Sequence, residues 1–137
     1  MIRRTFIALA AAAAILPGLA QAKDTITYQP GLIQQALDNG ETVFVDFFAE
    51  WCTTCRSQER AVTALRAQNP AYDEAITFIS VDYDKWGREP VSTSRNIPRR
   101  STLIVLKGDA ELGRIVADPR TSSIEALLNT GLAAAGS

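Results

Sequence analysis

Apolar positions along the chain follow two spacings that alternate, one typical of β-strands and one typical of helices. Residues 43–49 are an almost unbroken run of apolar, β-branched and aromatic side chains, as in a central strand that is covered on both faces. Residues 32–37 instead place their apolar side chains at helical spacing. The alternation predicts strands over residues 25–28, 43–49, 76–81, 102–106 and 112–117, and helices from 32 to Asn39-Gly40, from 53 to Asn69-Pro70, around 89–94 and from 122 onward.

The last predicted helix has its own start signal. Ser122 and Glu125 stand three residues apart, so that each side chain can bond a backbone N–H group at the helix start. No internal repeat, low-complexity tract or linker interrupts residues 23–137. The order β-α-β-α-β-(α)-β-β-α therefore predicts one α/β domain over residues 23–137.

The first 22 residues differ in composition from the rest of the chain. Arg3-Arg4 is a positive start, residues 5–20 are uncharged and rich in alanine, and Ala20-Gln21-Ala22 has the small-x-small form of a cleavage site. These features predict a signal peptide over residues 1–22, cleaved near Ala22-Lys23, and a periplasmic or secreted mature protein. A retained membrane anchor is the alternative, although the uncharged stretch is short for a bilayer span. The arginine pair also resembles a twin-arginine export signal.

Composition narrows the possible functions of the mature chain. Its 115 residues can bury an ordinary core without disulfide cross-links. Cleavage removes Arg3-Arg4 and changes the net charge from −1 to −3, which argues against a nucleic acid or a membrane surface as partner. The chain contains no histidine, and this excludes His-based catalytic triads and His-rich metal sites. A reaction must then use thiol, carboxylate, hydroxyl or backbone groups.

Cys52 and Cys55 are the only cysteines, and they follow the predicted strand over residues 43–49 directly. Two thiols at this spacing can close a ring with each other. A strand that runs into a helix at this point leaves Cys52 at the helix N-terminus, where unpaired N–H groups and the helix dipole stabilise a thiolate. The pair therefore predicts thiol–disulfide exchange.

The cysteine pair belongs to a longer motif, the run Val45-Asp46-Phe47-Phe48-Ala49-Glu50-Trp51-Cys52 followed by the second cysteine. This motif resembles the thioredoxin family, and the resemblance extends over residues 25–134. It implies a thioredoxin-like α/β fold, in which one domain has a central mixed β-sheet flanked by helices. Zinc ribbons and c-type haem proteins also use Cys-x-x-Cys, but this chain has neither a second cysteine pair nor a histidine after the first.

Three residues are candidates for the reaction itself. Cys52, nearer the helix start, is the expected nucleophile, and Cys55, one turn later, is the expected resolving cysteine and its disulfide partner. Asp46 is the only ionisable residue in the strand before the site, and burial there would raise its pKa and let it act as a general base through a water. The resemblance puts Asp46 at the position of the family's buried aspartate. The alternative is a solvated charge at a strand end.

The candidates for substrate binding are Trp51, Arg100 and Ser101. By the resemblance, Trp51 stacks beside the dithiol, and a loop before the fourth strand presents a cis-proline and main-chain groups that receive an extended substrate segment. A gap-free alignment puts Ser101 at the proline position, where its hydroxyl can bond a thiolate, whereas Pro98 takes that position only if three residues are inserted. Arg99 and Arg100 then supply a positive field or are two solvated charges.

These features favour an exported thiol–disulfide oxidoreductase that reduces protein disulfides in the periplasm, with reduction favoured over oxidation. We expect a monomer without a cofactor or a metal, with disulfide-bearing proteins as substrates and a membrane thiol-electron transporter upstream. Two alternatives stay open. One is a metal-binding or metallochaperone module that holds a soft ion on the two thiolates, and the other is a binding domain with a structural disulfide.

Overall fold

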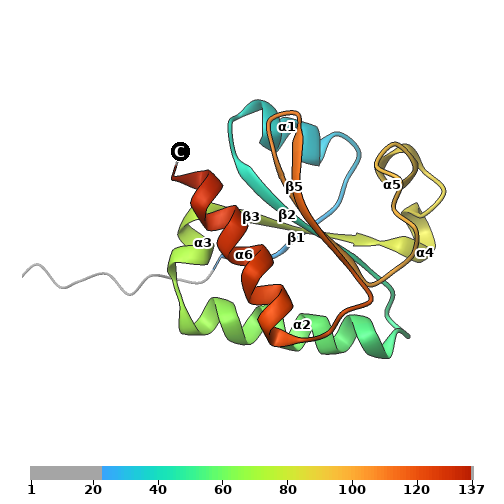
Figure 1. Cartoon of the computed structure of the whole chain (residues 1–137). Coiled ribbons are helices and arrows are strands. Elements are labelled where there is room, and N and C mark those ends of the chain that lie inside the picture. The colour runs from blue at the N-terminus through green and yellow to red at the C-terminus, as the bar shows by residue number, and fades with distance from the viewer. Residues whose placement is uncertain (1–22, 137) are drawn as a thin grey trace, which may run out of the picture.

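The computed structural model describes residues 23–136, which form a five-stranded mixed sheet flanked by helices, as predicted (Figure 1). The sheet order is β1-β3-β2-β4-β5, with β1, β3 and β2 parallel to one another and β4 antiparallel to both β2 and β5. The predicted signal peptide over residues 1–22 lies outside the described residues. The strands are β1 (Ile26–Thr27), β2 (Thr42–Phe48), β3 (Ile76–Asp82), β4 (Thr102–Lys107) and β5 (Ala110–Val116).

Helices cover both faces of the sheet (Figure 1). One face carries α1 (Leu32–Asp38), α4 (Tyr83–Trp86) and α5 (Pro90–Thr93). The other face carries α2 (Thr53–Gln68), α3 (Ala71–Ala75) and α6 (Thr121–Ala135). Between residues 23 and 136, no helix combines the length and the apolar character that crossing a bilayer requires.

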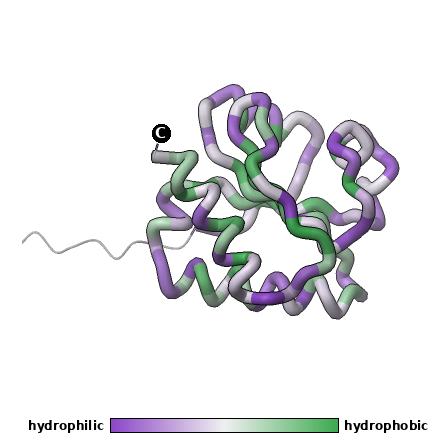
Figure 2. Tube along the Cα trace, viewed as in Figure 1, coloured by the Kyte–Doolittle hydropathy of each residue, from purple (hydrophilic) through white to green (hydrophobic). Residues whose placement is uncertain are grey.

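The unbroken apolar run of β2 follows from this two-sided cover. Val43, Val45 and Phe47 pack in the core on the α1 side of the sheet, while Phe44 packs in the core on the α2 side. Apolar side chains are therefore needed at successive positions, and the alternation of a half-exposed strand is lost. Figure 2 shows hydrophobic residues concentrated along the strands in the middle of the molecule and hydrophilic residues in the turns at its edges.

The structure differs from the sequence prediction in three places, at α3, at α4 and at the start of α6. The sequence pattern predicts no helix at α3 or α4, and it predicts a capping box of Ser122 and Glu125 that is wrong. The helix α6 begins one residue earlier, because its first backbone bond runs from the Ile124 N–H to the Arg120 carbonyl at 3.2 Å. The side-chain acceptor at this end is Asp118, whose carboxylate accepts the Arg120 N–H at 3.0 Å.

One edge of the sheet gathers the predicted site residues. The strand β2 ends at Phe48 and the chain enters α2 at Thr53, so Trp51 and Cys52 lie at that junction. The neighbouring strand β4 runs antiparallel to β2, and its first residue, Thr102, pairs with Phe47. The segment just before β4 is therefore brought beside the start of α2.

Candidate active site

Cys52 and Cys55 form a disulfide at the start of α2. Cys52 is the N-cap residue with an extended backbone, and the Cα atom of Cys55, one turn later, is 5.2 Å away. The Cys55 N–H donates to the Cys52 Sγ at 3.1 Å, which is the bond that a hydroxyl or carboxylate oxygen makes at other helix N-caps. In the reduced protein, this N–H group and the helix dipole stabilise a thiolate at Cys52.

Ser101 lies directly before β4 and contacts both sulfurs. Its Oγ is 3.1 Å from the Cys52 Sγ and 3.0 Å from the Cys55 Sγ, and the whole residue is buried. The gap-free alignment predicted that Ser101, and not Pro98, faces the dithiol. In the structure the Ser101 hydroxyl does lie against the two sulfurs. The described residues contain no cis peptide bond. The hydroxyl is a hydrogen-bond donor that a proline ring lacks, so this position can stabilise a thiolate.

The backbone of Ser101 is held from three sides. Its N–H donates to the Phe47 carbonyl at 2.8 Å, and its carbonyl accepts the Ala117 N–H at 2.9 Å. The same carbonyl accepts a bond from the Gln58 Nε2 at 3.1 Å. Ser101 has a φ of 63°, and a non-glycine residue in this left-handed region costs about 1 kcal/mol or more. The three bonds offset that strain.

Gln58 is a site residue that the sequence analysis missed. It is fully buried on α2, one turn after Cys55, and its Nε2 also donates to the Asp118 carbonyl at 3.2 Å. One amide thus ties α2 to the segment before β4 and to the segment after β5. The signal in the sequence is a polar residue within the apolar stripe of α2.

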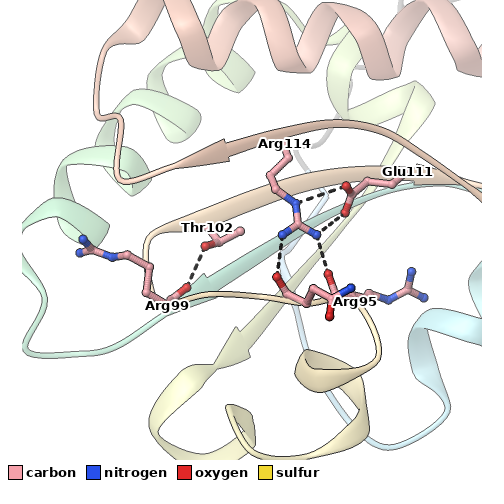
Figure 3. Close-up of polar contacts among 6 residues, drawn as sticks. Arg95, Arg99, Thr102, Glu111 and Arg114 are labelled. Carbon is pink, nitrogen blue, oxygen red and sulfur yellow. Dashed lines mark hydrogen bonds and ion pairs between the residues drawn. The ribbon is translucent and has the colours of Figure 1, made fainter.

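A second set of bonds fastens the loop that carries Ser101 (Figure 3). The Arg114 guanidinium on β5 donates to the carbonyls of Asn96 and Arg95, at 2.9 and 2.6 Å, and pairs with the Glu111 carboxylate at 2.7 Å. The Thr102 hydroxyl donates to the Arg99 carbonyl at 2.8 Å. The loop therefore presents its residues to the dithiol in a fixed arrangement.

Asp46 lies on β2, on the face of the sheet that α2 covers. It is therefore not a solvated charge at a strand end, which was the alternative interpretation from the sequence. Burial raises the pKa of the Asp46 carboxyl to about 7, and the negative charge of Glu59 adds to this rise. The carboxyl oxygen Oδ1 is buried and has no hydrogen-bond partner among the described residues. Such a carboxyl can take up and release a proton near neutral pH.

A cavity of about 390 Å³ connects this carboxyl to the disulfide. It lies between α2 and the β2–β3 part of the sheet, and Asp46, Cys55 and Glu59 all line it. A few water molecules can be held there, because the cavity is large enough and has polar groups in its wall. A proton can therefore pass between Cys55 and Asp46 through water.

Trp51 is a surface residue beside Cys52, with 57% of its area exposed. Its indole N–H donates to the Asp84 carboxylate at 2.7 Å. The Arg100 guanidinium lies over the ring, with Cζ 3.9 Å from the centroid. The neighbouring Arg99 is exposed, and its Nε donates to the Arg100 carbonyl at 3.0 Å.

The structure thus brings all the predicted site residues to one region. Ser101 contacts both cysteines, Asp46 shares a cavity with Cys55, and Arg100 stacks on Trp51 beside Cys52. Among the described residues, no three histidine, cysteine, aspartate or glutamate side chains come together in a group that could hold a metal ion. The chemistry that this arrangement supports is exchange between a dithiol and a disulfide.

Comparisons with known proteins agree with this geometry. The sequence profile of the Thioredoxin family matches residues 25–130. The chain is 29% identical over 84 residues to the thioredoxin of Echinococcus granulosus, and this match covers 61% of this chain and 73% of that protein. It is 30% identical over 95 residues to thioredoxin 1 of Nostoc sp. (strain PCC 7120), and this match covers 69% of this chain and 84% of that protein.

A solved structure supports the same assignment. The crystal structure of Trxlp from Edwardsiella tarda EIB202 has a TM-score of 0.66 at 28% identity, and the match covers 76% of this chain and 98% of that one. The profile match spans the whole sheet and the junction between β2 and α2 where the disulfide lies. This chain therefore belongs to the thioredoxin family and is a protein-disulfide oxidoreductase with an active-site Cys-x-x-Cys.

Proposed function

We propose that this protein is an exported reductase of protein disulfides that acts in the periplasm. The observation that carries the proposed reaction is the cavity that Asp46 shares with Cys55, next to a Cys52 that caps α2. Residues 1–22 support export, because they have the charge pattern and the cleavage-site form of a signal peptide.

In the first step, Cys52 is the nucleophile. Its thiolate attacks one sulfur of a substrate disulfide, a bond forms between Cys52 and that sulfur, and the substrate disulfide breaks. The other substrate sulfur leaves as a thiolate and takes a proton from solvent. The Cys55 N–H and the Ser101 hydroxyl stabilise the attacking thiolate, since each lies 3.1 Å from the Cys52 Sγ.

In the second step, Cys55 resolves the mixed disulfide. Asp46 accepts the Cys55 proton through a water in the cavity, and the Cys55 thiolate attacks the Cys52 sulfur. The bond between Cys52 and the substrate breaks, and the substrate leaves with both sulfurs reduced. The protein is left with the disulfide that the structure contains.

The direction of electron flow rests on the two residues between the cysteines. Thr53 and Thr54 bring no positive charge to the thiolate, so they do not favour the strongly oxidising couple in which a reduced form is heavily stabilised. A reductase outside the cytoplasm needs electrons from inside, and a membrane thiol-electron transporter is the proposed upstream partner. The substrates are disulfide-bearing proteins, and the enzyme works as a monomer whose substrate surface includes Trp51, Arg100 and Ser101.

The test is the reduction potential of the couple in the mature protein, measured by equilibration in thiol buffers and alkylation of free thiols. A potential below about −230 mV supports a reductase, whereas one above about −180 mV indicates a disulfide donor or isomerase. A pair that does not exchange, or that is purified with bound metal, favours a structural disulfide or a metallochaperone. The Cys55→Ser variant is the second readout, since only a reductase, donor or isomerase traps mixed disulfides with periplasmic proteins.

A further inference from the structure

The pair formed by Arg100 and Trp51 has a chemistry that the two-step reaction does not use. The guanidinium lies over the indole, with its Cζ 3.9 Å from the ring centroid, and the indole N–H donates to the Asp84 carboxylate at 2.7 Å. A cation over a tryptophan face is attracted by the ring quadrupole. The stacked side chain is therefore held in place at the surface beside Cys52.

The charge of Arg100 is not paired within residues 23–136. Its buried Nε has no hydrogen-bond partner, and no carboxylate among the described residues forms an ion pair with it. Arg66, Arg114 and Arg120 each pair with an acidic side chain, whereas neither Arg100 nor its neighbour Arg99 does so within residues 23–136. Arg100 differs from Arg99 in being stacked on the Trp51 ring. The two terminal nitrogens of the Arg100 guanidinium have no partner in the described part of the chain either, so they are left for an outside acceptor. The acceptor that fits a guanidinium in a bidentate manner is a carboxylate.

The position of Arg100 relates it directly to the reacting atoms. It precedes Ser101, whose Oγ is 3.1 Å from the Cys52 Sγ. Its stacking partner Trp51 directly precedes Cys52 in the chain. The stacked pair is therefore in position to meet the residues that flank a substrate cysteine. The bonds from Arg114 and Thr102 to the loop carbonyls, drawn in Figure 3, fix this loop before any substrate arrives.

We propose that Arg100, stacked on Trp51, is a specificity site for a carboxylate that lies within two residues of the substrate cysteine. The substrate class is then a disulfide-bearing protein segment with an aspartate or glutamate beside its cysteine. Asp84 at the indole edge disfavours a second carboxylate on that side of the ring. The inference rests on the proposed thiol–disulfide exchange and adds to it the kind of segment that reacts fastest.

The test uses reduced mature protein and three synthetic peptide disulfides. The peptides have blocked termini and differ only in the residue next to the cysteine, which is glutamate, glutamine or lysine. At low salt we expect the glutamate peptide to react about fivefold faster than the lysine peptide, and we expect added salt to reduce that ratio. The ratio is the readout because a change in the Cys52 thiol itself affects all three peptides alike.

Variants separate a site at Arg100 from a general positive field. Arg100→Gln should bring the ratio close to one, and Arg100→Lys should leave an intermediate value because it keeps the charge and loses the fork. Arg99→Gln is the matched control, since Arg99 is the exposed neighbour on the same loop, and it should keep most of the ratio. Thermal melting confirms that each variant is folded.

Three outcomes would overturn the inference. Equal rates with all three peptides in the wild-type protein remove it without any variant. If Arg99→Gln and Arg100→Gln lower the glutamate-to-lysine rate ratio equally, the preference comes from the general positive charge of the loop and not from a site at Arg100. Reaction with none of the peptides overturns the proposed exchange function, and the specificity with it.

Discussion

Replacing Ser101 by alanine removes one atom that contacts both sulfurs. The Oγ lies 3.1 Å from Cys52 and 3.0 Å from Cys55, and neither sulfur carries a hydrogen in the disulfide, so the hydroxyl donates. The backbone bonds of Ser101 to Phe47 and Ala117 do not involve the side chain and remain in the variant. The change therefore tests the hydroxyl with little effect on the loop.

The expected size of the effect follows from the difference between the two redox forms. A hydrogen bond to a charged group contributes about 1.5 to 3 kcal/mol, whereas a bond to a neutral disulfide sulfur is weak. Taking the lower value for the net loss, Ser101→Ala raises the pKa of the Cys52 thiol by about one unit, at about 1.4 kcal/mol per unit. The same loss lowers the reduction potential by about 30 mV, which makes the couple more reducing.

Two measurements check this prediction. The rate of alkylation against pH reports the pKa of the Cys52 thiol, and equilibration in thiol buffers reports the potential. Ser92→Ala is the matched control, because Ser92 is also fully buried and its Oγ has no hydrogen-bond partner in the part of the chain that the structure describes. If Ser101→Ala melts like the wild type and leaves both values unchanged, the hydroxyl does not stabilise the thiolate and the reasoning is wrong.

Three further predictions concern Asp46 and Gln58. Asp46→Asn should slow resolution of the mixed disulfide about 100-fold and leave the first attack unchanged, as rapid mixing of each step would measure. Burial raises the pKa of Asp46 from 3.8 to about 7, so the native state holds a proton that the unfolded state has lost. The free energy of unfolding should therefore fall, by as much as about 4 kcal/mol, as the pH rises from about 4 to about 7. Urea unfolding should show this fall in the wild type and not in Asp46→Asn. Gln58→Leu should destabilise the protein by about 1 to 3 kcal/mol, since the carbonyls of Ser101 and Asp118 lose their amide partner, and should move the potential toward that of Ser101→Ala. A Gln58→Leu protein with wild-type potential would show that the amide has no part in placing the hydroxyl.

The junction of β2 and α2 was predictable because its signals are local. A strand buried on both faces shows as a continuous apolar run, and a cysteine at a helix start shows in the change of period after it. The position of Ser101 was also predictable, since strand spacing alone relates it to Thr102. These features depend on the order of residues and on little else.

The parts that escaped prediction depend on contacts between distant segments. The role of Gln58 arises from carbonyls on two loops that only the fold brings to α2, although a polar residue among Cys55, Val62 and Leu65 is a visible signal. The stacking of Arg100 on Trp51 joins residues far apart in the chain. The capping box at Ser122 failed because the turn at Asp118 starts α6 earlier than the local pattern suggests.

The hydrogen bonds of Ser101 have a consequence for how a substrate can be held. Its N–H extends the pairing of β4 with β2, and its carbonyl extends the pairing of β4 with β5, so both groups are used inside the sheet. An extended substrate segment therefore cannot pair with the main-chain groups of Ser101. The main-chain binding that the resemblance to thioredoxins implies for this loop has to use other residues of the loop. At Ser101 itself only the side chain is left to meet a partner, and its hydroxyl lies against the two sulfurs that react.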